Sequence, residues 1–101
     1  MYKIISVTDK DGNIKQSFMD DMKSKHGDLS GDFYYDIEEL KRRAEFGIIV
    51  SCGFVWNDDM SKMLRTSQVE EVVDDGNIVT IVTRNSVYVF EGMEENNAWP
   101  R

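Results

Sequence analysis

Two short segments of the chain place an arginine two residues before a serine. Guanidinium groups bind phosphate through paired N–H donors, and neighbouring hydroxyls donate to the remaining oxygens or to ribose. If the segments lie on neighbouring strands, they predict a site for a cyclic or phosphorylated nucleotide, with Trp56, Tyr88 or Phe90 as a stacking surface. Their residue types also suit strands and turns, which is the alternative interpretation. The residues of this candidate ligand site are Arg65, Thr66, Ser67, Arg84, Asn85 and Ser86.

The acidic residues form a second candidate site. The first 50 residues carry a formal charge of −2 and the rest of the chain carries −5, much of it as adjacent pairs. Carboxylates spaced along a rigid sheet imitate a row of phosphates and attract a basic protein surface. Solubility and protection of sheet edges predict the same pattern. The predicted partner-binding residues are Glu70, Glu71, Asp74, Asp75, Asp58, Asp59 and Trp56, with Trp56 or Trp99 as an exposed aromatic anchor.

Catalytic and metal signatures are weak. His26 and Cys52 are the only histidine and the only cysteine. Cys52 lies in an apolar segment and His26 in a polar one, a context that favours a structural thiol over a Cys–His nucleophile pair. Structural zinc usually takes four Cys or His ligands, more than this chain offers. We therefore expect no enzyme, no metal and no cofactor.

A calcium loop is a further possibility near the N-terminus. Asp9, Asp11, Asn13 and Asp20 occupy its first, third, fifth and twelfth places, but Ile14 stands where the loop needs glycine. The position of Gly12 favours a turn, with weak ion binding as the alternative.

These candidate sites must be positioned by the predicted elements. Residues 2–8 predict a strand and residues 9–13 a turn. Residues 14–25 fit either a returning strand or a helix, because both spacings are present. Gly27 and Gly31 bracket a polar loop, and residues 36–46 predict an amphipathic helix with Asp36 and Glu39 as a capping box and Gly47 at its end.

The second half of the chain predicts an antiparallel meander. Residues 48–56 suit a strand with a kink or bulge at Gly53, and a turn follows at residues 57–59. Residues 62–73, 78–83 and 87–91 predict three more strands, the first two joined by a tight turn over residues 74–77. The expected fold class is α+β: an N-terminal strand or hairpin, one amphipathic helix and a curled sheet of about four strands that can close as a small SH3-like barrel. We expect a single domain over residues 1–95 and a flexible tail over residues 96–101.

Composition limits the function classes. The chain has 101 residues, 41 % of them hydrophobic, and a net charge of −7, which predicts a folded domain and disfavours direct nucleic-acid binding. The cluster Lys41, Arg42 and Arg43 is flanked by acids and predicts a salt-bridged face. A single cysteine fits a reducing compartment, and no apolar run resembles a signal peptide or a membrane span. We expect a cytoplasmic protein.

A resemblance rests on the segments 66–69 and 83–88, in which Thr-Ser-x-Val is followed by Thr-x-Asn-Ser-x-Tyr. The stretches 64–69 and 79–90, which contain this pattern and comprise 18 of the 101 residues, resemble the C-terminal strands of small proteins carried by phages and other mobile elements. The size, the acidity and the lack of catalytic groups are similar to those of anti-CRISPR proteins. The resemblance implies an inhibitor of host defence.

Three functions are therefore predicted. The first is a non-enzymatic inhibitor that binds a host nucleic-acid-binding protein, a CRISPR–Cas effector, through its acidic surface. The second is a sponge for a nucleotide signal that uses Arg65 and Arg84. The third is a structural or regulatory phage protein that forms homo-oligomers through an exposed sheet edge.

Overall fold

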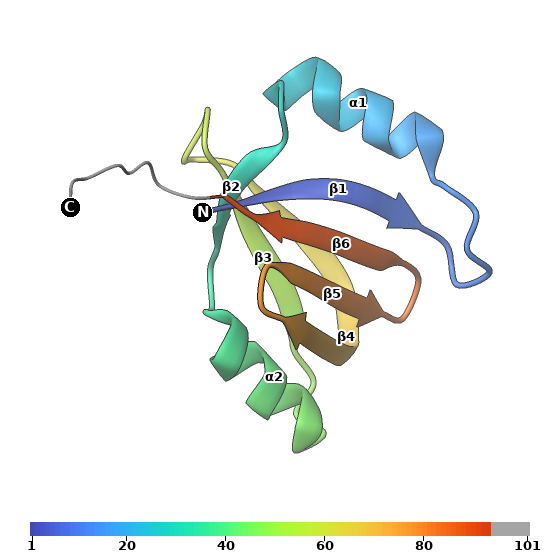
Figure 1. Cartoon of the computed structure of the whole chain (residues 1–101), viewed down its shortest axis with the longest axis vertical. Coiled ribbons are helices and arrows are strands. Elements are labelled where there is room, and N and C mark those ends of the chain that lie inside the picture. The colour runs from blue at the N-terminus through green and yellow to red at the C-terminus, as the bar shows by residue number, and fades with distance from the viewer. Residues whose placement is uncertain (94–101) are drawn as a thin grey trace.

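The strands of the C-terminal half alternate between buried and more exposed side chains, as a sheet with one face on a core requires. In β5 (Ile78–Thr83) and β6 (Val87–Gly92), every second residue through Phe90 is buried. The computed structural model describes residues 1–93 and shows these strands as part of a closed barrel of six antiparallel strands in sequence order (Figure 1). The other four strands are β1 (Tyr2–Thr8), β2 (Ser30–Phe33), β3 (Ser51–Trp56) and β4 (Met63–Asp75).

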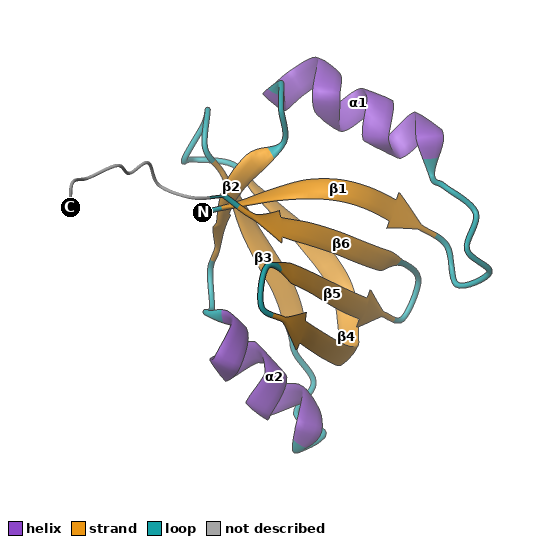
Figure 2. Cartoon of the chain, viewed as in Figure 1, coloured by secondary structure: helices purple, strands orange, loops and turns teal. Residues whose placement is uncertain are grey.

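The core lies inside the barrel and is rich in aromatic rings. The rings of Phe54 and Phe90, both fully buried, have centroids 5.1 Å apart, and Phe33 packs edge-on against both. Two helices lie on either side of the strands (Figure 2). Helix α1 (Gln16–His26) buries Met19 and Met22, and helix α2 (Ile37–Glu45) buries Ile37 and Leu40. Each helix therefore adds two apolar side chains to the barrel core.

Three register shifts bend the strands so that the sheet can close. One extra residue lies in β1 between Ile4 and Ser6, and β4 carries one extra residue against β3 and another against β5. An extra residue bends a strand and increases its twist, which promotes curvature. The second shift in β4, between Val69 and Glu71, leaves Val69 and Val72 buried although they are three positions apart.

The N-terminal strand and turn are confirmed. The Asp9 carboxylate accepts hydrogen bonds from the backbone N–H groups of Asp11 and Asn13, and Gly12 supplies a positive φ of 92°. The segment that fitted both a strand and a helix contributes one bridge, between Thr8 and Ile14, and then forms α1.

Helix α2 is also confirmed, and its predicted range includes the two flanking cap residues. The Asp36 side chain accepts a hydrogen bond from the backbone N–H of Glu39, which satisfies one of the free N–H groups of the first turn. At the other end, Gly47 has a φ of 76° and donates to the Ala44 carbonyl. The salt-bridged face is confirmed for Arg42 and Arg43, which both pair with Glu39.

The predicted polar loop around Gly31 is wrong in part, because Ser30–Phe33 form β2. The expected N-terminal strand and four-strand sheet therefore lack β2, and the expected single helix lacks α1. Strand β2 is short and contains Gly31 and Asp32, which have low β propensity, so its pairing with β1 and β3 decides its conformation. A Cβ on Gly31 would lie 2.1 Å from the Val55 carbonyl oxygen, so this position requires glycine.

The meander is confirmed with adjusted boundaries. Strand β3 begins at Ser51, three residues later than expected, whereas β4 extends to Asp75. The bulge expected at Gly53 corresponds to a register shift between Ser51 and Gly53 whose extra residue lies in β4. Gly76, with a φ of 76°, and Asn77 connect β4 to β5.

Among residues 1–93, neither helix has the length and apolar character needed to cross a membrane. The predicted tail over residues 96–101, with Trp99, lies outside the described residues, as do the last two positions of the predicted domain.

Replacing Gly31 with alanine tests the close approach of β2 and β3. The added Cβ would collide with the backbone of Val55, so we expect the free energy of unfolding, measured by urea denaturation, to fall by about 2 kcal/mol or more. Gly53→Ala is the comparison variant, because its Cβ would meet only side-chain atoms, the Met63 sulfur at 2.8 Å and the Tyr34 Cβ at 3.2 Å, so we expect a smaller loss. Equal losses for the two variants would contradict this account of β2.

Candidate functional site

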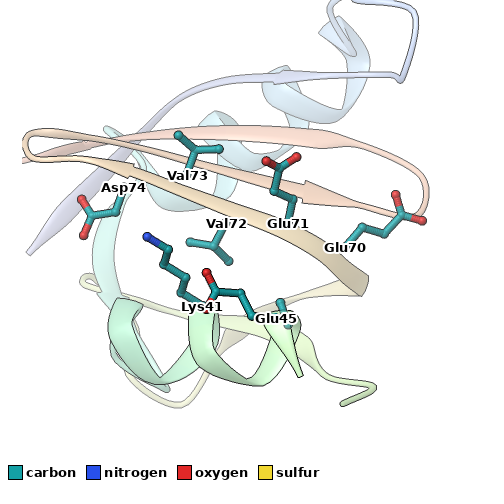
Figure 3. A pocket seen from close by; sticks show the side chains of 8 residues that line it. Lys41, Glu45, Glu70, Glu71, Val72, Val73 and Asp74 are labelled. Carbon is teal, nitrogen blue, oxygen red and sulfur yellow. The ribbon is translucent and has the colours of Figure 1, made fainter. Parts of the chain in front are cut away.

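The acidic residues of β4 fall on both faces of the strand. Glu71 and Asp75 pair in register with Val82 and Ile78 of β5 and lie on the outer face with Val73, opposite the buried Val72. Figure 3 shows Glu71 and Val73 on the side of β4 away from Val72. Because side chains alternate along a strand, Asp74 belongs to the other side, toward α2. The acidic residues that were predicted to form one contact face therefore lie on opposite sides of β4.

The bulge in β4 explains why two consecutive glutamates are exposed. In a regular strand, one of Glu70 and Glu71 would point into the core. The extra residue allows both carboxylates to face solvent. Glu70 forms an ion pair with Lys10, 2.9 Å away in the loop after β1, whereas Glu71 has no ion pair within residues 1–93.

A hollow separates β4 from α2 (Figure 3). Its acidic lining residues are Glu45, Glu70, Glu71 and Asp74, and its one basic lining residue is Lys41. Lys41 forms no ion pair shorter than 4 Å with any described residue, so it offsets the carboxylates only at longer range. The hollow is therefore negatively charged overall.

The aromatic anchor predicted at Trp56 is wrong, because Trp56 is only 4 % exposed. Its ring stacks on the ring of His26, with centroids 4.2 Å apart and planes 7° from parallel. His26 is the last residue of α1, and its Nδ1 lies 3.0 Å from the Asp58 carboxylate. Trp56 therefore joins α1 to the barrel and is unavailable to a partner.

The predicted acidic residue Asp59 has a local structural role. Its carboxylate accepts hydrogen bonds from the backbone N–H and the hydroxyl of Ser61, and these bonds hold the pKa of Asp59 below its usual value. Asp59 therefore stabilises the connection between β3 and β4.

The two Arg-x-Ser segments are neighbours, as their predicted role requires. The backbone N–H of Arg84 donates to the Gln68 carbonyl at 2.8 Å, and the N–H of Asn85 donates to the Ser67 hydroxyl at 3.3 Å. The segments nevertheless do not form one site, because Arg65 lines a separate hollow with Tyr34 and Tyr35.

Part of the predicted ligand site is structural. Thr66 is buried, and its hydroxyl accepts from the Cys52 backbone N–H and donates to the Ser67 carbonyl. The proposed stacking residues Trp56, Tyr88 and Phe90 are buried as well. Thr66, Trp56 and Phe90 therefore stabilise the barrel, whereas Tyr88, although only 6 % exposed, also lines a hollow.

The remaining residues of these segments line a second hollow that includes Lys15. The Lys15 ammonium donates to the Ser86 hydroxyl at 2.6 Å, and Ser67 and Asn85 lie beside it. Phe18 and Tyr88 supply an aromatic wall, and burial raises the pKa of Tyr88. Sequence reasoning missed Lys15, because it lies 71 positions before Ser86 and at the start of a segment whose secondary structure was ambiguous.

Cys52 and His26 have separate surroundings. Burial raises the pKa of the Cys52 thiol to about 12, whereas His26 contacts Trp56 and Asp58. A thiol in this state is a poor nucleophile at neutral pH. In residues 1–93, no group of three or more His, Cys, Asp or Glu side chains is arranged to hold a metal ion.

Comparison with protein-family models, with curated proteins and with solved structures finds no match for this chain.

Alkylation by iodoacetamide at pH 8 tests the buried state of Cys52. A pKa of about 12 against an ordinary 9.0 lowers the thiolate fraction about 1,000-fold, so we expect at least this protection in the folded protein and its loss in urea. A Ser17→Cys variant in a Cys52→Ala background places a thiol on the exposed surface of α1 and should react readily in the folded protein. Rapid alkylation of folded Cys52 would contradict its burial.

Proposed function

We propose that this protein is a non-enzymatic inhibitor that binds a host nucleic-acid-binding protein through the acidic surface around β4. The observation that carries the proposal is the bulge between Val69 and Glu71, which holds two consecutive carboxylates outward on a rigid strand. A basic surface that normally binds phosphates is complementary to such an array. The resemblance to anti-CRISPR proteins makes a CRISPR–Cas effector the partner we propose.

The barrel supports this function by fixing the spacing of the charges. Strand β4 pairs with β3 on one side and with β5 on the other. Glu71 and Asp75 are four residues apart on the same face, which corresponds to about 13 Å along a strand. Carboxylates held by a paired strand lose less conformational freedom on binding than those of a flexible tail would.

The surroundings of β4 add to the negative potential. Glu45 of α2 faces the same hollow as Asp74, and Glu91 of β6 is paired in register with Ile78, the β5 neighbour of Asp75. Long-range attraction between such a surface and a basic partner raises the rate of association, and added salt lowers it.

The fold gives less support to the alternative function, a protein that forms homo-oligomers through an exposed sheet edge. Strands β1 and β6 pair with each other and close the barrel, so the described sheet has no terminal strand of the kind that this alternative requires.

Charge reversal of Glu71 and Asp75 tests the acidic surface. Neither carboxylate accepts a hydrogen bond within residues 1–93, so Glu71→Lys with Asp75→Lys should leave the fold intact. We expect association with a purified Cas effector lacking guide RNA, followed by surface plasmon resonance, to slow at least roughly tenfold. Raising the salt concentration should also slow association of the unmodified protein.

The matched control reverses Asp11 and Asp20 to lysine. Both residues are exposed: Asp11 lies in the loop after β1, and Asp20 lies in the second turn of α1, where it accepts a hydrogen bond from the Gln16 side chain. The double variant has the same net charge as the test variant. It should associate at nearly the unmodified rate. If the unmodified protein fails to bind the effector, or if both double variants bind equally, the proposed acidic contact is wrong.

A further inference from the structure

A second candidate site lies where the start of α1, the middle of β4 and the loop between β5 and β6 meet. The hollow there has a volume of about 290 Å³. We propose that it binds a small phosphoryl-bearing ligand, with the Lys15 ammonium and the Ser67 hydroxyl as the principal donors. This inference is independent of the acidic surface. Its lining residues are Lys15, Phe18, Ser67, Asn85, Ser86 and Tyr88.

The charge of Lys15 is not neutralised by an adjacent carboxylate. The side chain is half-buried and bonds to the Ser86 hydroxyl, and no described carboxylate lies within 4 Å of its ammonium. Backbone hydrogen bonds, chiefly from Asn13, lower the pKa of Asp9, and the charge of Lys15 makes only the smallest contribution. The Asp9 carboxylate already accepts backbone N–H groups. A partly desolvated ammonium with this environment favours an anion.

The two serines have different roles in the hollow. Ser67 accepts a hydrogen bond from the Asn85 backbone N–H and has one hydroxyl hydrogen to donate. Ser86 is buried, accepts the hydrogen bond from Lys15 and also forms a side-chain hydrogen bond with Tyr88, so it positions the ammonium. Lys15 and Ser67 therefore present donors of the kind that surround bound phosphate oxygens.

The N-terminal end of α1 also favours an anion in this hollow. Lys15 is the N-cap residue, its side chain makes no capping hydrogen bond, and the first turn contains no acidic residue. The first N–H groups of a helix lack partners within the helix and carry partial positive charge. These N–H groups therefore favour binding of an anion, as the Lys15 ammonium does.

The aromatic side chains of this hollow distinguish two possible ligands, inorganic phosphate and a nucleoside monophosphate. Phe18 is half-buried and Tyr88 is buried, so the wall is apolar and fixed by the core. Inorganic phosphate would use the donors alone, whereas a nucleoside monophosphate would also place its base or ribose against Phe18. The hollow lies at the lower end of the volumes that hold small ligands.

Titration with inorganic phosphate and, separately, with AMP tests the site. Both titrations are followed by ¹H–¹⁵N NMR at constant ionic strength. We expect saturable shifts of the amide signals of residues 16–18 and 84–86. Tighter binding of AMP with shifts at Phe18 identifies a nucleotide site, and equal affinities identify a phosphate site. Absence of saturable shifts at these amides with both probes overturns the proposal.

Lys15→Gln should weaken binding at least roughly tenfold. Lys23→Gln, which removes the same charge from the exposed last turn of α1, should not. Because Lys15 contributes to the folded structure, Asn85→Asp gives a second test: it places a carboxylate in the hollow and should abolish binding, whereas Asn77→Asp in the turn after β4 should not. Unchanged affinity of folded Lys15→Gln or Asn85→Asp overturns the proposal.

Discussion

Pairing between the first and the last strand is the constraint on which the rest of the structure depends. Strands β1 and β6 hydrogen-bond along nearly their whole length, and this pairing turns a meander into a closed barrel. Closure requires strongly bent strands, and β1 and β4 meet this requirement with extra residues. The bend that closes the barrel also sets which carboxylates of β4 face outward. The proposed acidic contact is therefore a consequence of barrel geometry as well as of composition.

Much of the fold is predictable where the signal is local. Alternating apolar residues identify β5 and β6, Asp36 marks the start of α2, and Gly76 marks a tight turn. Strand β2 has no such signal, since its backbone is extended by pairing with β1 and β3. The ambiguity before α1 has a similar origin: its apolar side chains suit two periodicities, and contact with the barrel selects the helix.

The candidate sites were predictable to a smaller extent. Sequence identifies the acids of β4, because their charge is visible without a structure, but it does not reveal the bulge that determines which way they face. The sequence does not reveal that Trp56 is buried, because its stacking partner, His26, lies 30 positions earlier in the chain. The two Arg-x-Ser segments are predicted to be neighbours, because consecutive strands of a meander pair with each other. The contact of Lys15 with Ser86 is not predictable in this way, because it depends on how α1 packs against the barrel. Long-range packing is the information that a single sequence lacks.

The pairing of β1 with β6 also has a consequence for biosynthesis. The barrel cannot close until the ribosome has translated β6, which ends at Gly92. At about 5–20 residues per second, the chain takes about 5–20 seconds to make. During most of that time β1 lacks one of its two strand partners. The first half of the chain, with a charge of only −2, is therefore the part most exposed to premature association during synthesis.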